Sequence, residues 1–122
     1  MRSLRILLVD DDREIRALIT EYLGMVGHDV VETGSGREAV ELIELVEQSF
    51  DIAIVDWQME GISGKEVTST LRKKLPETQI LLATGRGAED LPESMLLRFS
   101  EEVLRKPFSM KKMQEAITRL VH

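Results

Sequence analysis

Five short strand-like runs alternate with longer segments in which apolar residues recur every three or four positions. The runs have the length expected of buried strands and cover residues 4–9, 30–31, 52–55, 79–83 and 102–106. The stretch from Ile6 to Val9 is apolar at every position, as expected for a strand covered on both faces of a parallel sheet. The pattern therefore predicts a parallel sheet with helices packed against both of its faces.

Helical periodicity and local capping residues predict five helices between and after these runs. They cover residues 12–26, 35–48, 63–75, 91–99 and 109 onward. The S-x-x-E spacing of a capping box begins two of them, at Ser35 and Ser63, and Ser109 is expected to cap the last. Because strands and helices alternate strictly and crossovers in such sheets are right-handed, we predict a doubly wound α/β domain with a five-stranded parallel sheet and five helices.

The length and composition predict a single domain over residues 1–122, since 122 residues leave no room for a second folded module. Charged residues make up 31% and hydrophobic residues 43%, which is typical of a soluble globular protein. The net charge of -6 argues against direct binding of nucleic acid, whose phosphates are bound by clustered basic side chains. No apolar window approaches ~18 residues and no signal-peptide pattern begins the chain, so we expect no membrane span and a cytoplasmic location.

Four of the strand-like runs end in residues that phosphoryl chemistry uses. In chain order these are Asp10, Asp11 and Asp12, then Asp56, Thr84 and Lys106. In an open parallel sheet, ligands bind beyond the carboxyl ends of the strands, so the four termini can share one site. Asp12 alone is enough to cap the following helix, which leaves Asp10 and Asp11 for a hard cation that prefers oxygen ligands. Carboxylates, a hydroxyl and an ammonium at one edge of the sheet predict a site that accepts a phosphoryl group with the help of magnesium.

Each of these residues also has a simpler interpretation. The aspartates after the first strand could all serve the helix N-terminus, Asp56 could be a turn residue, and Thr84 could satisfy its hydroxyl locally. Lys106 could be an exposed lysine before Pro107, which is a candidate for a cis peptide bond. The combination weighs against these interpretations, because carboxylates crowded at adjacent strand ends repel one another unless a divalent cation lies between them.

Four segments together resemble the receiver domain of bacterial two-component response regulators. They read L-L-V-D-D-D, D-I-A-I-V-D-W, I-L-L-A-T-G and L-R-K-P-F, and they follow the family's order and approximate spacing over essentially the whole chain. The resemblance implies the flavodoxin-like strand order 2-1-3-4-5, which is one of the common orders of doubly wound sheets. It also implies that Asp56 is the phosphoacceptor and that Lys106 and Thr84 contact the phosphoryl group.

The resemblance further implies a metal cofactor and protein partners. The cofactor is Mg²⁺, with Mn²⁺ as a possible substitute, held by Asp10, Asp11, Asp56 and the backbone carbonyl of Gln58. The phosphoryl donor is a sensor histidine kinase or a histidine phosphotransfer protein, and the domain catalyses only its own phosphorylation and dephosphorylation. Its output is a conformational switch read by a downstream protein target or by an effector domain outside this sequence. The expected assembly is a monomer or a weak phosphorylation-dependent dimer.

The switch is where the sequence departs from the family pattern. The family usually has an aromatic residue, whose rotation follows the threonine, at the position of Val103. Phe99 is a candidate substitute, so the expected switch residues are Thr84, Val103 and Phe99. Gln58 occupies a position associated with the lifetime of the phosphoryl group, which the sequence leaves open.

Two alternative functions come from other classes of protein. Asp10 and Asp12 form a D-x-D pair that resembles haloacid-dehalogenase-type phosphatases, in which the first aspartate is the nucleophile. Glu14 breaks that motif, which expects Thr or Val, and the chain is short for that class. In the second alternative, the domain is a receiver-like interaction module that binds partners without phosphorylation.

Overall fold

A computed structural model describes residues 2–85 and 91–121 of the chain. Strands and helices alternate as the sequence predicts. The strands are β1 (Arg5–Val9), β2 (Asp29–Thr33), β3 (Ile52–Asp56), β4 (Gln79–Thr84) and β5 (Glu102–Arg105). The helices are α1 (Arg13–Val26), α2 (Gly36–Leu45), α3 (Gly64–Lys74), α4 (Glu93–Leu96) and α5 (Met110–Val121).

All strand pairs in the five-stranded sheet are parallel, and the strand order is β2-β1-β3-β4-β5. This order confirms the doubly wound, flavodoxin-like arrangement. From β1 the chain goes first to β2 on one side and then to β3 on the other, so the strand order reverses between β1 and β3. Val9 of β1 pairs with Val55 of β3 at this point. A ligand crevice is expected beyond the carboxyl ends of the strands at this reversal, and Asp10 and Asp56 lie there.

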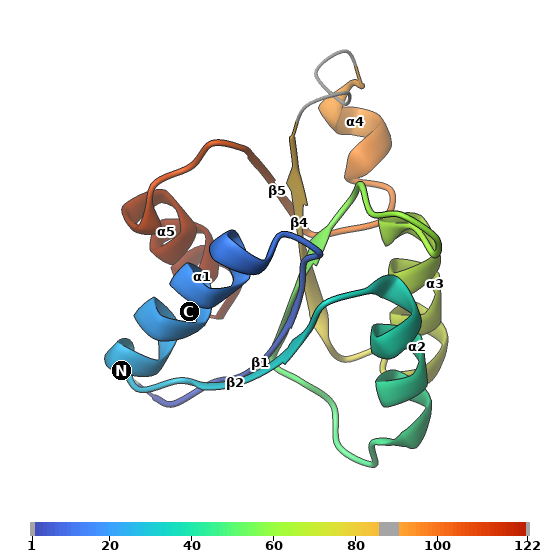
Figure 1. Ribbon diagram of the computed structural model, residues 1–122, viewed down its shortest axis with the longest axis horizontal. Coiled ribbons are helices and arrows are strands. Elements are labelled where there is room, and N and C mark those ends of the chain that lie inside the picture. The colour runs from blue at the N-terminus through green and yellow to red at the C-terminus, as the bar shows by residue number, and fades with distance from the viewer. Residues whose placement is uncertain (1, 86–90, 122) are drawn as a thin grey trace.

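Helices cover both faces of the sheet, with α1 and α5 on one side and α2, α3 and α4 on the other (Figure 1). Each face has its own hydrophobic core, because alternate residues of a strand point to opposite faces. Leu7 and Val9 of β1 pack into the core under α2 and α3, whereas Ile6 and Leu8 pack into the core under α1 and α5. The central strands are therefore apolar on both faces, which explains their continuous apolar runs.

The predicted N-cap residues cap their helices, although the Glu38 carboxylate accepts from the N–H of Gly34 and not from that of Ser35. The Asp12 side chain accepts hydrogen bonds from the backbone N–H groups of Glu14 and Ile15 at the start of α1. Ser35, Ser63 and Ser109 cap α2, α3 and α5 by accepting from the N–H group three residues further on. Among the described residues, no helix combines the length and the apolar character needed to cross a membrane.

Two predicted helices are shorter in the structure. The helix predicted over residues 35–48 ends at Leu45, because Val46 has an extended backbone with ψ 147. The helix predicted over residues 91–99 contains only Glu93–Leu96, with Pro92 as its N-cap. Tight turns follow the helix, and in one of them the N–H of Phe99 donates a hydrogen bond of 3.0 Å to the carbonyl of Leu96. Such bonds to the residue three positions back commonly close the last turn of a helix.

Candidate functional site

The turn after β1 places two carboxylates at the edge of the sheet. Asp10 is 2% exposed, and its Oδ1 accepts a hydrogen bond of 2.8 Å from the N–H of Asp12. The N–H of Asp10 donates to the carbonyl of Thr33 on β2 at 3.3 Å. Asp11 is exposed and lines a cavity of about 240 Å³ together with Asp56, Gln58 and other residues of the site.

Asp56 ends β3 beside this turn and is 5% exposed. Its Oδ1 accepts a hydrogen bond of 3.1 Å from the N–H of Gln58. The loop that follows is held on both sides, since the N–H of Trp57 donates to the carbonyl of Ala83 at 2.8 Å and the N–H of Gly64 donates to the carbonyl of Trp57 at 3.1 Å. The Asp56 carboxyl group is thus buried on a loop that backbone hydrogen bonds hold in place, and it lines the cavity.

Lys106 contributes a positive charge from the loop after β5. Its Nζ lies 3.1 Å from Oδ2 of Asp10 and 3.4 Å from Oδ2 of Asp56. Burial opposes its charge, but the two carboxylates outweigh this effect and raise the pKa of Lys106 above its ordinary value. Lys106 is therefore an ammonium throughout the physiological range. The peptide bond from Lys106 to Pro107 is cis, as the sequence suggested.

Asp56 is harder to ionise than an ordinary aspartate. Burial raises its pKa, Lys106 lowers it, and Asp10 raises it again, with the result that the pKa of Asp56 is about 6. The hydrogen bond from Gln58 favours the ionised form but does not reverse the shift. A cation entering the cavity would favour the carboxylate further.

The acidic side chains are suited to a hard divalent cation. Asp10, Asp11 and Asp56 each offer a carboxylate oxygen, and these oxygens lie within 4.8 Å of one another. Mg²⁺ is bound through one or two carboxylates with further oxygen ligands, so this donor set fits it. The structure brings three of the predicted ligands together, whereas the ligand role of the Gln58 carbonyl stays a prediction.

Thr84 ends β4 at the same edge and is 1% exposed. Its Oγ1 is buried and has no hydrogen-bond partner among the described residues. An unsatisfied buried hydroxyl is unfavourable, so Thr84 has a donor available for an anionic group that enters the site.

Two of the predicted switch residues, Val103 and Phe99, pack against the core under α2 and α3. Val103 lies on β5 opposite Leu82 of β4. Phe99 lies between α4 and β5, and its ring centroid is 5.4 Å from that of Trp57. Lys65 of α3 places its Nζ 5.7 Å from the Phe99 centroid. Phe99 is thus in direct contact with the loop that follows Asp56.

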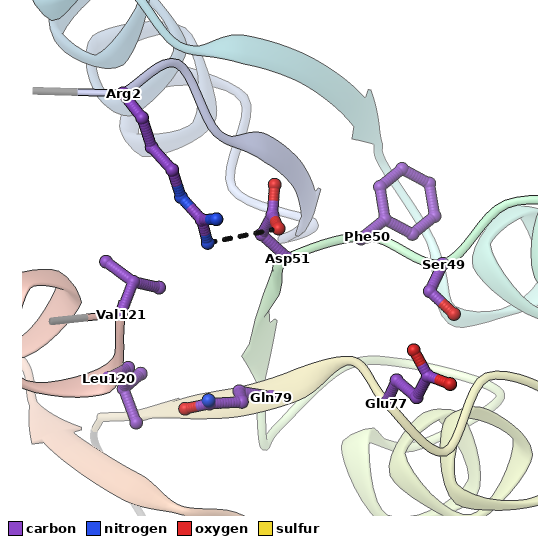
Figure 2. Close-up of a pocket in the computed structure, with 8 residues that line it drawn as sticks. All are labelled: Arg2, Ser49, Phe50, Asp51, Glu77, Gln79, Leu120 and Val121. Atoms are coloured by element: carbon purple, nitrogen blue, oxygen red, sulfur yellow. Dashed lines mark hydrogen bonds and ion pairs between the residues drawn. The ribbon is translucent and has the colours of Figure 1, made fainter.

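A larger cavity of about 560 Å³ lies at the opposite end of the sheet and contains none of the predicted site residues. Figure 2 shows its lining, in which Arg2 forms an ion pair with Asp51. Asp51 precedes β3 and Gln79 begins β4, which places this cavity at the amino ends of the strands. It is therefore separate from the edge where ligands bind in open parallel sheets.

Arg16 of α1 was not identified from the sequence. Its Nη1 donates a hydrogen bond of 2.8 Å to the carbonyl oxygen of Asp10, and its Nε donates one of 3.0 Å to Oε1 of Glu32. Its residue type does not distinguish Arg16 from other basic residues on an amphipathic helix. Its only signal is its position four residues after the Asp12 cap, one helical turn from the acidic cluster.

The family model of the response regulator receiver domain matches residues 6–118. The chain belongs to the response regulator receiver family. Membership favours the receiver function over the phosphatase alternative, in which Asp12 would be part of the catalytic pair. In this receiver domain Asp12 instead caps α1.

Curated relatives resemble this receiver domain over most of its length. It is 31% identical over 118 residues to the transcriptional regulatory protein CpxR of Escherichia coli, covering 96% of this chain and 49% of CpxR. It is 29% identical over 115 residues to the response regulator protein FleR of Pseudomonas aeruginosa, covering 94% of this chain and 24% of FleR. The chain thus spans less than half the length of either relative.

Solved structures agree with the fold and the family. The response regulator protein TrrA of Thermotoga maritima, in complex with Mg²⁺-BeF, matches with a TM-score of 0.81 and 31% identity, over 97% of this chain and 99% of TrrA. TrrA has also been solved in complex with the histidine kinase ThkA. TrrA, a protein of this fold and family, therefore has both a magnesium complex and a histidine kinase complex.

Proposed function

We propose that this receiver domain accepts a phosphoryl group on Asp56 from a phosphohistidine of a sensor histidine kinase or a histidine phosphotransfer protein. The observation that carries the proposal is the buried Asp56 carboxylate, which faces Lys106 Nζ at 3.4 Å within a cluster of acidic oxygens. A turn aspartate with a purely structural role does not require a paired ammonium and two further carboxylates beside it.

The metal in this proposal is Mg²⁺, with Mn²⁺ as a substitute, held by Asp10, Asp11, Asp56 and the backbone carbonyl of Gln58. When bound, the cation supplies positive charge for the phosphoryl oxygens and relieves the repulsion among the carboxylates. The all-oxygen donor set supports a hard cation over a softer one.

The transfer itself needs alignment and charge neutralisation more than strong bases. A carboxylate oxygen of Asp56 attacks phosphorus while the bond from phosphorus to the donor imidazole nitrogen breaks. The electron pair of that bond returns to the imidazole, and an aspartyl phosphate forms. Lys106 provides an ammonium for a phosphoryl oxygen, and Thr84 provides a hydroxyl that lacks a partner among the described residues. Water later hydrolyses the aspartyl phosphate and resets the domain.

The surface beside the acceptor supports the proposal that the phosphoryl donor is a protein. An apolar groove of about 500 Å³ adjoins the acidic cavity and shares Ile15, Gly85 and Lys106 with it. Leu18, also in its lining, is 56% exposed. A donor protein that covers this groove would place its phosphohistidine next to Asp56.

Phosphorylation is proposed to act as a signal through Thr84, Val103 and Phe99. The new phosphoryl group recruits the Thr84 hydroxyl and so changes the end of β4. The changed surface is read by a downstream protein or an effector domain. We place the domain in the cytoplasm, as a monomer or a weak phosphorylation-dependent dimer.

The test is phosphorylation by acetyl phosphate, followed by intact-mass spectrometry with and without magnesium. The proposal expects the mass of one phosphoryl group in wild type with magnesium and none in Asp56→Asn. Asp29→Asn, at an exposed position on β2, is the matched control and should be phosphorylated like wild type. Absence of the gain in wild type, also with a phosphohistidine donor, would favour the phosphorylation-independent module. Multiple turnover of a phosphate ester that survives Asp56→Asn but not Asp10→Asn would favour the phosphatase alternative.

A further inference from the structure

The guanidinium of Arg16 lies beside the acidic turn after β1 and joins this turn to β2. Nη1 donates to the carbonyl oxygen of Asp10 at 2.8 Å, beyond the end of β1, while Nε donates to Glu32 on β2 at 3.0 Å. The Arg16 side chain is 18% exposed and that of Glu32 is 42% exposed. Arg16 is therefore held in place by its own salt bridge while it binds the backbone of the turn.

The Arg16 contact holds the carbonyl of Asp10, to which no other described residue donates a hydrogen bond. The N–H of Asp10 is bound to Thr33, and Oδ1 of Asp10 is bound to the N–H of Asp12. The carbonyl of Asp10 belongs to the peptide plane that continues into Asp11, and that plane is rigid. The direction in which the chain enters Asp11, and hence the direction of its carboxylate, depends on the orientation of the Asp10 carbonyl.

The neighbouring backbone leaves room for this guanidinium. A Cβ atom at Gly34, after β2, would lie 3.1 Å from Nη1 of Arg16. Such a contact is tighter than ordinary packing, so a side chain at this position would press on the guanidinium. Gly34, Glu32 and the Asp10 carbonyl together surround the guanidinium of Arg16.

We propose that Arg16 is a positioning residue that directs Asp11 toward the divalent cation, and this inference rests on the proposed function. The two possible roles of Arg16, as a positive charge and as a positioning contact, predict opposite effects of its removal on cation binding. Loss of a positive charge beside three carboxylates should tighten the binding of a divalent cation. Loss of a positioning contact should weaken that binding, so the sign of the change distinguishes the two roles.

The test compares the magnesium affinity of wild type, Arg16→Gln and Arg13→Gln by isothermal titration calorimetry and by the fluorescence of Trp57. Arg13 is exposed on the first turn of α1 and has no hydrogen bond or ion pair with the described residues, so its substitution removes the same charge without the contact. We expect about 10-fold weaker binding in Arg16→Gln, the size typical of residues that orient metal ligands. Unchanged or slightly tighter binding is expected in Arg13→Gln.

Unchanged or tighter magnesium binding in a folded Arg16→Gln variant would overturn the inference. If circular dichroism shows that this variant does not fold, Arg16→Lys decides the question, because it keeps the charge but cannot reproduce the planar fork that reaches two acceptors. Arg16→Lys should then bind magnesium more weakly than wild type, and equal affinity would overturn the inference. Failure of wild type itself to bind magnesium would count against the proposed function instead.

Discussion

Lys106 and Asp10, 96 positions apart in the chain, form an ion pair in which Nζ and Oδ2 are 3.1 Å apart. The pair is possible because β1 and β5 end at the same edge of a parallel sheet, although β3 and β4 lie between them. The loop after β5 must bring Lys106 toward β1, because this separation exceeds the reach of one lysine side chain. The segments that follow the first and the last strand are thus joined at the acceptor site.

Replacing Lys106 with glutamine should slow phosphorylation of Asp56. The variant loses the ammonium that would face a phosphoryl oxygen, and loss of one such electrostatic contact typically costs about 100-fold in rate. It also loses an interaction that lowers the pKa of Asp56. The rate of phosphoryl incorporation from acetyl phosphate, followed by intact mass, measures the effect. Lys111→Gln, at an exposed position on α5, is the control, and equal rates in the two variants would contradict the role of Lys106.

Replacing Asp56 with asparagine should stabilise the metal-free protein above neutral pH. The pKa of Asp56 is raised from 3.8 to about 6 in the folded state, so folding favours the protonated form. This contribution to stability is fully present below the unfolded value and is lost as the pH rises through the folded value. An asparagine side chain cannot ionise, so Asp56→Asn should exceed wild type by about 2 kcal/mol at high pH, allowing for partial solvent screening.

Chemical denaturation at a series of pH values measures this difference in unfolding free energy. The difference should shrink as the pH falls from above 6 toward the unfolded pKa. Magnesium should also reduce it, because a bound cation offsets the cost of the buried carboxylate, and a chelator should restore it. A difference that is the same at every pH would show that the carboxylate of Asp56 carries no such cost.

Adding a methyl group at Gly64 should disturb the acceptor loop. A Cβ atom there would lie 2.5 Å from the carbonyl oxygen of Asp56 and 2.6 Å from Cα of Trp57. These are backbone atoms that cannot move aside like a side chain, so we expect Gly64→Ala to lose about 2 kcal/mol of stability. Gly24 in α1 has no heavy atom within 4 Å of such a Cβ, and Gly24→Ala should gain about 0.5 to 1 kcal/mol. Thermal unfolding of both variants tests the pair, and a stable Gly64→Ala variant would refute the close packing.

Much of this architecture could be predicted from the sequence because its signals are local. Apolar runs, helical periods and capping serines identify every strand and helix, and the chemistry at the strand ends follows from the geometry of parallel sheets. The meeting of Asp10, Asp11 and Asp56 could be inferred from this geometry. The order of the strands could not, since alternation of strand and helix allows several orders, and the resemblance to a family supplied it.

The parts that escaped prediction depend on contacts between distant residues. Arg16 contacts the Asp10 carbonyl and Glu32, and the latter lies 16 positions away on another strand. The predicted length of α4 was wrong because apolar content alone did not reveal the tight turns that follow Leu96. The contact between Trp57 and Phe99 likewise joins two loops that no periodic pattern relates.

Replacing Phe99 with leucine should uncouple phosphorylation from its readout at Trp57. The two rings are 5.4 Å apart and inclined by 40°, so Phe99 connects the loop after Asp56 to the segment between α4 and β5. Leucine keeps most of the apolar volume but removes the ring contact, which is worth about 1 kcal/mol. Phosphoryl incorporation should continue, since the Phe99 side chain has no polar group that could take part in the transfer.

Trp57 fluorescence before and after phosphorylation measures this coupling, with Val103→Ala as the comparison variant. If Phe99 carries the switch, the fluorescence change on phosphorylation is smaller in Phe99→Leu and is retained in Val103→Ala. The reverse result would assign the switch to β5, where the family usually has its aromatic residue. An equal change in both variants and wild type would mean that the signal leaves the site through Thr84 without either side chain.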